Sequence, residues 1–397
     1  MFHRMNPLEL AGGWVYGFHD DPMPPYGGLA PRAVLENSLR SCLVQDPCMI
    51  AFSGGRDSSA LLAVAVHVAR RDGLPLPIPV TLRYQDAPGS EESDWQQLVL
   101  AHLAVHDHVV ISVGDEHDPI GPIAAPLLKR HGVVWPPNFT PSWRQLDTAR
   151  GGVLVTGECG DEVLGHKRIT ALSNLLRQLK AGRQPDRRLY RPVLHSLVPA
   201  PLRRRAELRN RYVRPWLREP VEMQLTQQGL ADELAYSLHA GRHAWQCVDR
   251  RAVQGMLDSV HAFAAELDVT YSVPFAEPEF VSSLAHALGV WGWRSRTDAM
   301  TRLFGDLLPP AILGRTTKAH FGHGIFTEHT RAFARQWNGR GVDDELVDPE
   351  ALRDNWLSEL PHLPAMGLLQ AAWLASQPAT PAAPEEAPAS RVESTPS

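Results

Sequence analysis

A short apolar run that ends in two glycines constrains the fold of this chain more than any other feature. Residues 48–52 (CMIAF) carry no charge and are typical of a buried strand, and a helical pattern follows over 58–70. Ser53-Gly54-Gly55 lies between them, and glycine permits positive φ angles and a close backbone approach. The sequence therefore predicts a strand–turn–helix unit, the building block of a parallel α/β sheet.

Similar units recur along the first half of the chain. Apolar-rich runs at 80–84, 108–113 and 152–156 predict three more strands, and 30–43 and 91–104 have helical spacing. Strands that alternate with helices favour a parallel sheet covered by helices on both faces. Strand signals then fade in the second half, so we expect an α/β core followed by a mostly helical part.

The turn after the first strand has the composition of a phosphate-binding loop. Successive N–H groups in such a turn form an anion nest, and the following helix N-terminus favours negative charge. Asp57 would repel phosphate, so we expect Asp57 to hold a Mg²⁺ ion that bridges to the phosphates. The alternative is an ordinary turn with a serine N-cap. The residues expected to cradle phosphate are Ser53, Gly54, Gly55, Asp57, Ser58 and Ser59.

A second acidic turn follows the predicted strand at 152–156. Glu158, Asp161 and Glu162 fall within five residues and are interleaved with glycines. Carboxyl ends of parallel strands meet at one edge of a sheet, where α/β proteins bind ligands. We therefore expect Asp161 to be a second Mg²⁺ ligand and Glu158 to act as a base or to orient an amine. The alternative is a polar turn with a capping acid.

Composition excludes several classes of protein. Lys plus Arg is 39 and Asp plus Glu is 44, a net charge of −5, so a nucleic-acid partner is not expected. The 4 cysteines are too few for a disulfide framework, which favours a cytoplasmic location. The longest apolar run, 60–66, is far below the ~20 residues of a membrane span. The Arg-rich stretch Arg203–Arg218 predicts either a solvated helix face or a docking surface for an acidic partner or leader peptide.

Four segments, in order, resemble the synthetase domain of the asparagine synthetase family, within the N-type ATP pyrophosphatases. Residues 53–58 resemble the pyrophosphate loop of that family, and 156–162 resemble its Ser-Gly-Glu-x-x-Asp-Glu segment. Residues 273–280 are similar to its Pro-Phe-Leu-Asp segment, and 315–321 to its lysine-bearing Lys-x-Gly-Phe segment. The resemblance implies an ATP-pyrophosphatase core of the adenine nucleotide alpha hydrolase-like type.

The resemblance also implies a reaction. It is the ATP-dependent joining of a carboxylate, in an amino acid or a peptide, to an amine donor through an acyl-adenylate, with release of AMP and pyrophosphate. By the same resemblance Lys318 neutralises developing charge, and Phe52, Thr156 and Gly157 read the adenosine. The product is left open between asparagine and a specialised amide or lactam, as in lasso peptide cyclases and β-lactam-forming synthetases. Two alternatives stay open: a tRNA- or base-modifying ATP pyrophosphatase, and a degenerate relative that binds nucleotide without catalysis.

Several positions depart from the family pattern. Arg56 replaces an aliphatic residue, His166 replaces a glycine, and Ala319 and His320 replace a Gln-Gly pair. The catalytic N-terminal cysteine of the glutaminase half has no counterpart, since no cysteine precedes Cys42. We therefore expect no glutaminase activity in this chain, and a separate amidotransferase or a precursor peptide as its partner.

These features divide the chain. Residues 1–30, rich in glycine and proline, are expected to be an irregular lead-in, and 31–376 one synthetase-like domain. Within it, 31–165 is the α/β nucleotide-binding core and 166–376 is mainly helical. Residues 377–397 lack aromatic residues and almost all branched aliphatic ones, so they cannot repay their ordering entropy and are expected to be a disordered tail.

Overall fold

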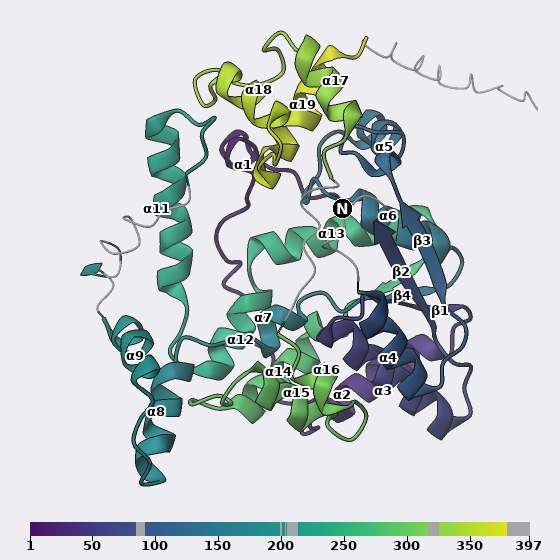
Figure 1. Cartoon of the computed structure of the whole chain (residues 1–397), viewed down its shortest axis with the longest axis vertical. Coiled ribbons are helices and arrows are strands. Elements are labelled where there is room, and N and C mark those ends of the chain that lie inside the picture. Colours follow the sequence, from purple (N-terminus) through teal and green to yellow (C-terminus); the bar gives the residue numbers. More distant parts are fainter. Residues whose placement is uncertain (85–91, 199–200, 203, 205–212, 317–324, 379–397) are drawn as a thin grey trace, which may run out of the picture.

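A five-stranded parallel sheet forms the centre of the computed structural model, which describes all residues except 85–91, 199–200, 203, 205–212, 317–324 and 379–397 (Figure 1). The strand order is β3-β2-β1-β4-β5, and every neighbouring pair is parallel. Met49 of β1 pairs with Ile78 of β2 on one side and with Leu154 of β4 on the other. The strands are β1 (Cys48–Ala51), β2 (Ile78–Tyr84), β3 (Val109–Val113), β4 (Val153–Val155) and β5 (Thr270–Ser272).

The predicted α/β fold class is confirmed, and the sequence pattern located four of these strands to within about two residues. It missed β5, which lies in the part expected to be helical. This strand has three residues, Thr270–Ser272, of which only Tyr271 is buried. A run so short carries too little periodicity to be recognised, and its position beside β4 is set by pairing.

Strand order reverses direction between β1 and β4, and this places helices on both faces of the sheet. The chain moves outward from β1 through β2 to β3, then returns to the other side of β1 for β4 and β5. Because βαβ crossovers are right-handed, the two directions put their helices on opposite faces. The carboxyl ends of β1 and β4 therefore flank a switch point, where open α/β sheets bind ligands. The helices of this half are α2 (Pro31–Leu43), α3 (Arg56–Asp72), α4 (Ser93–Leu103), α5 (Ala124–His131), α6 (Thr140–Thr148) and α7 (Gly160–Leu164).

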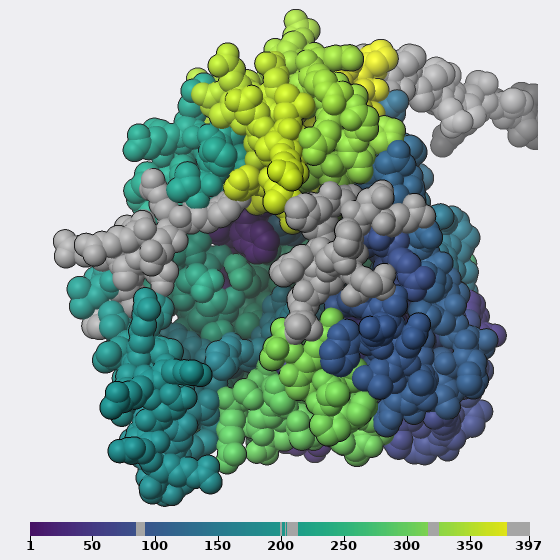
Figure 2. Space-filling view, in the orientation of Figure 1, coloured from purple at the N-terminus to yellow at the C-terminus, as the bar shows by residue number. Residues whose placement is uncertain are grey.

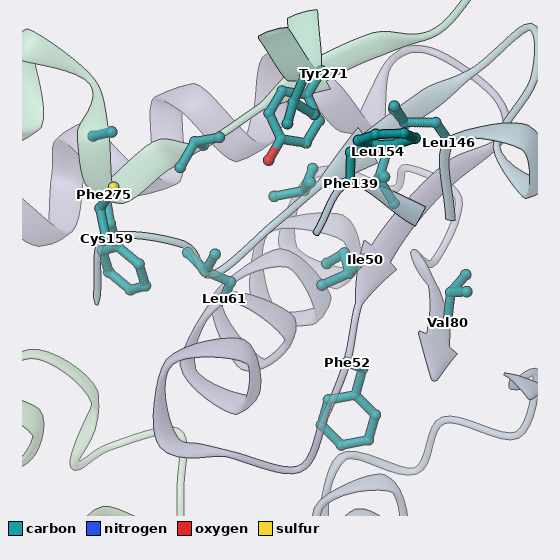
Figure 3. Packing of buried hydrophobic residues seen from close by; sticks show 14 of the residues in the cluster. Ile50, Phe52, Leu61, Val80, Phe139, Leu146, Leu154, Cys159, Tyr271 and Phe275 are labelled. Atoms are coloured by element: carbon teal, nitrogen blue, oxygen red, sulfur yellow. The ribbon is translucent and has the colours of Figure 1, made fainter. Parts of the chain in front are cut away.

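The core lies around the central strands. Figure 3 shows Ile50 of β1 with Leu61 of α3 on one side and, on the other, Leu146 of α6 and Phe139, which directly precedes α6. All four side chains are at most 1% exposed. Burying each such side chain stabilises the fold by about 1.5–3 kcal/mol. The packing of α3 and α6 against β1 therefore fixes the position of the strand that ends in the first loop.

Residues 1–30 are not wholly irregular, in contrast to the expectation. Helix α1 (Pro7–Gly12) begins with a capping box in which Asn6 and Glu9 each accept a bond from the other's backbone N–H. The helix is anchored from the second half of the chain, because Trp216 Nε1 donates to the Ala11 carbonyl at 2.9 Å. The Asn-x-x-Glu spacing is the sequence signal that would have predicted this helix.

The second half is mainly helical, as expected. Its C-terminal helices form the upper lobe beside α1 in Figure 1, and Figure 2 shows α8 and α9 as a projection at the lower left. None of the helices in the described part of the chain is long and apolar enough to cross a membrane. The helices are α8 (Thr170–Lys180), α9 (Tyr190–Leu197), α11 (Glu219–Ala235), α12 (Ala240–Val248), α13 (Arg251–Glu266), α14 (Pro278–Leu288), α15 (Arg296–Phe304), α16 (Pro310–Leu313), α17 (Glu328–Gln336), α18 (Pro349–Leu357) and α19 (Met366–Ser376).

The structure describes only part of the Arg-rich stretch Arg203–Arg218, because residues 203 and 205–212 lie outside the described residues. Arg204 is helical and exposed, whereas 213–218 is not helical. Arg214 pairs with the buried Glu222 at 3.2 Å, and Arg218 pairs with Asp348 at 3.1 Å. These two arginines therefore hold elements of the fold together.

Candidate active site

The first loop leaves β1 and enters α3 without a serine cap. Gly55 is the N-cap residue of α3 and no side chain caps the helix, which contradicts the alternative of an ordinary serine-capped turn. Gly54 has φ +84°, a conformation that other residues rarely adopt. The first amides of a 17-residue helix are thus left without a side-chain partner at the edge of the sheet. Such amides are suited to bind an anion.

Two side chains donate hydrogen bonds to carbonyl groups of the first loop and hold it in place. Gln96 Nε2 donates to the Ser53 carbonyl at 3.1 Å, and Arg315 donates to the Gly54 carbonyl at 2.8 Å. Arg315 is buried, forms an ion pair with Glu92, and has its guanidinium carbon 4.8 Å from the centre of the Trp95 ring. In a trans peptide the N–H points opposite to the C=O. Gln96 and Arg315 therefore direct the amides of the glycine pair away from themselves.

The three serines predicted to cradle phosphate occupy different positions. Ser53 and Ser58 line the cavity, and their hydroxyls lie 3.2 Å apart. Ser58 Oγ also donates to the Gly55 carbonyl at 3.2 Å. Ser59 is 0% exposed and is not among the lining residues, so its hydroxyl faces the core instead. The helical spacing places Ser58 and Ser59 about 100° apart, and only one of them can face the edge.

The second loop packs directly on the first. Gly157 lies between β4 and α7, and Gly160 is the first residue of α7. A Cβ on Gly157 would lie 3.0 Å from the Ser58 nitrogen. A Cβ on Gly160 would lie 2.6 Å from Asp57 Cγ. Both glycines are therefore required by the close approach of the two strand ends. The juxtaposition expected from parallel-strand topology is present, with Asp57 and Asp161 at one edge.

Arg296 lies between these two aspartates, and sequence reasoning missed it. It is the first residue of α15, whose N-cap Ser295 accepts a bond from the Asp298 N–H at 3.1 Å. One guanidinium nitrogen donates to Asp57 Oδ2 at 2.5 Å, and the other forms an ion pair with Asp161. The only local signal was an Arg at a helix start, which does not reveal a partner 239 residues away.

Burial governs the charges at this edge. Burial raises the pKa of the Asp57 carboxyl, and the Arg296 guanidinium works against that rise. Burial also acts to lower the pKa of Arg296, but the carboxylates of Asp57 and Asp161 outweigh it and the pKa is raised. Burial, with the neighbouring Arg296, lowers the pKa of Arg56, which lines the same cavity. Two arginines and two aspartates thus share one partly desolvated space.

Two of the residues expected to read adenosine, Phe52 and Thr156, already use their backbone N–H groups in the sheet. Phe52 N–H donates to the Val80 carbonyl at 2.8 Å, and Thr156 N–H donates to the Ser272 carbonyl at 2.9 Å. The Phe52 carbonyl accepts a bond from Thr81 Oγ1 at 2.5 Å and keeps its second lone pair. Contacts from these two residues to an adenosine would therefore come from carbonyl oxygens or side chains.

Both loops open onto one cavity of about 540 Å³, a usual size for a small-molecule site. Pro141, Ser142 and Gln145 of α6 line it opposite the loops, together with Tyr84 and Tyr271 from the strands. Arg315 and Thr316 also line it, so the segment that contains Lys318 starts at the cavity. Lys318 itself lies outside the described residues, as do Ala319 and His320. The predicted residues that line the cavity are Phe52, Ser53, Gly55, Asp57, Ser58, Thr156, Gly157, Glu158 and Asp161.

Cys159 is buried within the second loop, directly before α7, and is not suited to be a nucleophile. It is 4% exposed, and burial raises the pKa of its thiol well above the usual range. Its φ of +64° places it in the left-handed region. Cys159 therefore shapes the turn that presents its acidic neighbours.

Two carboxylates at this edge, Asp57 and Asp161, are the candidate ligands for Mg²⁺. Among the described residues, no three His, Cys, Asp or Glu side chains lie close enough together to hold a metal ion. Asp57 Oδ1 is buried and has no hydrogen-bond partner, so it offers a lone pair to an incoming ligand. Protein Mg²⁺ sites at nucleotides use one or two carboxylates plus phosphate and water oxygens. Asp57 and Asp161 therefore fit a Mg²⁺ ion that arrives with a nucleotide.

Comparison with known proteins supports the sequence resemblance. A family model described as asparagine synthase matches residues 30–377, which is most of the 397-residue chain. The matched span corresponds to a synthetase domain alone. A search of curated proteins finds no match.

Proposed function

The chain belongs to the asparagine synthase family of ATP-dependent amide-forming ligases, and from that premise we propose that it joins a carboxylate to an amine through an acyl-adenylate. The observation that carries this proposal is the contact between the two strand-end loops. Gly160 leaves room for the Asp57 side chain, so a phosphate cradle and a second carboxylate share one cavity. A carboxylate beside a phosphate cradle repels phosphate unless a cation lies between them, so this arrangement supports a site for a metal-bound nucleotide.

In the proposed first step, a carboxylate oxygen of the substrate attacks the α-phosphorus of ATP. The bond from that phosphorus to the bridging oxygen breaks, and pyrophosphate leaves with the electron pair. This step depends mainly on positioning and charge neutralisation. The loop amides and the Ser53 and Ser58 hydroxyls would hold the departing pyrophosphate, and Arg56 would add a positive charge beside it. When bound, Mg²⁺ held by Asp57 and Asp161 would neutralise phosphate charge.

In the proposed second step, the amine nitrogen attacks the acyl carbon and AMP leaves. The nitrogen must lose a proton, and Glu158, which lines the cavity, would accept it. Lys318, carried over from the family segment, would neutralise the developing oxyanion. Glu158 and Lys318 are accordingly the proposed catalytic residues.

The substrates are proposed at the level of chemical class. The carboxylate belongs to an amino acid or a peptide, and a separate amidotransferase or a precursor peptide supplies the other reactant. Asparagine, a specialised amide and a macrolactam are all products of this chemistry. The reaction is proposed to take place in the cytoplasm, because all four cysteines are free and buried.

The test is a screen for pyrophosphate exchange. Purified protein is incubated with ATP, Mg²⁺, labelled pyrophosphate and pools of amino acids or peptides, and label in ATP is counted. We expect exchange that needs one class of carboxylate and Mg²⁺, is lost in Asp57→Ala, and is kept in Asp354→Ala, which changes an exposed carboxylate outside the cavity. Exchange that persists in Asp57→Ala would remove the metal role. Turnover only with added tRNA would favour the base-modifying class, and nucleotide binding without turnover of any acid would favour a degenerate relative.

A further inference from the structure

Arg296 occupies the space that a cation bridging Asp57 and Asp161 would use. Its two terminal nitrogens bind Asp57 Oδ2 and Asp161 Oδ1, one oxygen from each carboxylate. The side chains of Arg296 and Asp57 are 21% and 16% exposed, whereas that of Asp161 is 38% exposed, so the three charges are partly removed from water. Two partly buried carboxylates so close together repel each other strongly unless a cation lies between them. The guanidinium supplies that cation.

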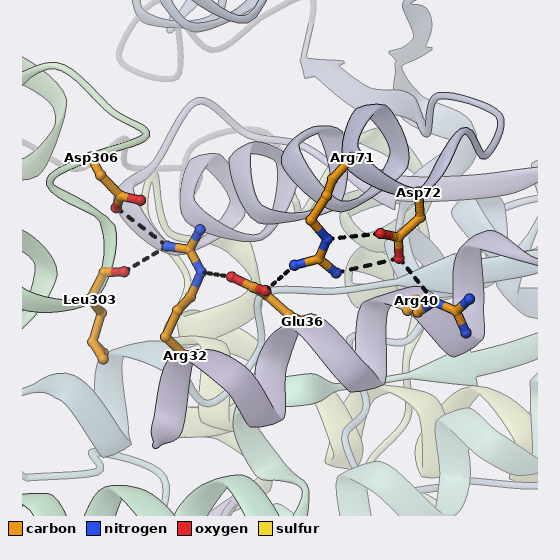
Figure 4. A network of polar contacts seen from close by, with 7 residues as sticks. All are labelled: Arg32, Glu36, Arg40, Arg71, Asp72, Leu303 and Asp306. Carbon is orange, nitrogen blue, oxygen red and sulfur yellow. Dashed lines mark hydrogen bonds and ion pairs between the residues drawn. The ribbon is translucent and has the colours of Figure 1, made fainter. Parts of the chain in front are cut away.

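The backbone that carries Arg296 is fixed to the backbone that carries Asp57. Figure 4 shows the network: Arg32 of α2 donates to the Leu303 carbonyl of α15 at 2.7 Å and pairs with Glu36. Glu36 in turn pairs with Arg71, near the end of α3, at 2.6 Å. Helix α2 therefore ties α15 to α3, and α15 also contacts α3 directly. These contacts favour side-chain rotation, with the helices left in place, as the way in which the contact between Arg296 and Asp57 changes.

The guanidinium and a divalent metal cannot bridge the same two oxygens at once. Asp57 Oδ1 is still available to a metal, but Oδ2 and the Asp161 oxygen are held by Arg296. A nucleotide changes this balance, because its phosphates offer a guanidinium a new anionic partner of matching geometry. Arg296 can then leave the carboxylates without being left as an unpaired buried charge. Its Nε, buried and without a hydrogen-bond partner, is a further donor for that contact.

We propose that Arg296 is a placeholder cation. It holds Asp57 and Asp161 in position before a nucleotide binds, and it leaves them to contact the phosphates when a divalent metal arrives with the nucleotide. This inference rests on the proposed function for the identity of the nucleotide. It makes metal binding conditional on nucleotide binding. Two carboxylates without Arg296 between them would bind divalent ions in the absence of nucleotide. Arg296 prevents this because it already occupies their oxygens.

The test measures metal binding directly, with Mn²⁺ as the probe and the loss of its free-ion EPR signal as the readout. Full-length protein is titrated at pH 8, where carboxylates stay ionised, with and without α,β-methylene ATP, which cannot be cleaved at the reacting bond. The variants are Arg296→Met, which removes the charge, and Arg296→Lys, which keeps it. Arg302→Met is the matched control, because Arg302 lies on the same helix, pairs with Asp298, and is 54% exposed outside the cavity.

We expect wild type and Arg302→Met to bind Mn²⁺ weakly without nucleotide. Arg296→Met should bind it about tenfold or more tightly, since the carboxylates have lost their buried cation. Adding Asp57→Asn to Arg296→Met should reverse that gain. With metal present, Arg296→Met should bind α,β-methylene ATP about tenfold more weakly than wild type, through loss of a charged phosphate contact. Arg296→Lys should fall between the two in both titrations.

Several outcomes would overturn the proposal. Tight Mn²⁺ binding to nucleotide-free wild type would overturn it. This measurement needs no variant, so it decides even if Arg296→Met fails to fold. Unchanged Mn²⁺ affinity in a folded Arg296→Met would show that the arginine is only a structural bridge. If no form binds α,β-methylene ATP, the proposed function fails, and the Mn²⁺ titrations without nucleotide still decide whether Arg296 blocks the metal.

Discussion

Gly160 and Asp57 are in such close contact that no side chain fits between them. The ideal Cβ position at Gly160 is 2.6 Å from Asp57 Cγ and 2.8 Å from its Oδ1. Gly160 begins α7 after β4, and Asp57 lies in the first turn of α3 after β1. The contact joins the ends of two neighbouring strands, and it fixes the direction of the Asp57 carboxylate.

Gly160→Ala should therefore displace Asp57 and impair nucleotide use before it unfolds the protein. We expect an overpacking cost of about 1–3 kcal/mol and pyrophosphate exchange at least tenfold lower. Chemical denaturation and exchange assays measure the two effects. Gly27→Ala is the control, because no atom lies within 4 Å of the added methyl group. Normal exchange in Gly160→Ala would show that the position of the Asp57 carboxylate is unimportant.

Arg315→Met should make the first loop less well held, because it removes a hydrogen bond to that loop. The change removes the bond to the Gly54 carbonyl and the ion pair with the buried Glu92. Breaking a buried pair in this way costs about 3–5 kcal/mol. We expect a lower urea midpoint and weaker nucleotide binding.

The double variant Arg315→Met/Glu92→Gln separates the two contributions of Arg315. It also removes the negative charge that Arg315 pairs with, so much of the stability should return. The hydrogen bond to the loop stays lost, so weak nucleotide binding should remain. Recovery of both properties would argue against a role for Arg315 in holding the loop.

His243 should make stability depend on pH. Burial lowers the pKa of this imidazole to about 3, and the nearby Lys167 adds to the shift. In the unfolded chain the pKa is near 6.5, so between these values only the unfolded state takes up the proton. The free energy of unfolding should then fall as the pH drops below about 6.5, by up to ~1.4 kcal/mol per pH unit.

Urea unfolding of wild type and His243→Asn at several pH values between 7 and 4.5 measures this effect. Asparagine cannot take up the proton, and its side-chain oxygen can replace Nδ1, which accepts a bond from the Arg168 N–H at 3.3 Å. We expect a flatter pH dependence in the variant. Parallel curves for the two proteins would rule out His243 as the titrating group.

Glutamine should not be hydrolysed by this chain. The first cysteine in the sequence is Cys42, which is 6% exposed and has its thiol pKa raised by burial. A nucleophilic thiol needs exposure and a lowered pKa. An enzymatic glutamate assay with glutamine as the only nitrogen source should therefore give the blank value, and ammonium should be the better donor if the product is a primary amide. Glutamate release above the blank would contradict this expectation.

Much of the candidate site could be predicted before any coordinates, because its signals are local. Apolar runs that end in glycines mark strand ends, and parallel topology brings such ends to one edge. That reasoning placed Asp57 and Asp161 together. It erred on Ser59, since the helical phase that turns one serine to the edge and the next into the core depends on how α3 packs. It also took residues 1–30 as irregular, although Asn6 and Glu9 have the spacing of a capping box.

The amino-acid sequence alone determined which residue types follow each central strand, because chain direction, turn geometry and periodicity are properties of neighbouring residues. Tertiary structure decided which distant side chains serve those turns. Arg296 reaches the two aspartates because α15 packs directly on α3 and is also linked to it through α2. Arg315 supports the glycine pair because its segment returns to the sheet edge. The sequence around an arginine does not reveal which acidic or carbonyl group it will contact. Here Asp57 and Gly54 lie 239 and 261 residues away from their arginines, so tertiary packing decides these contacts.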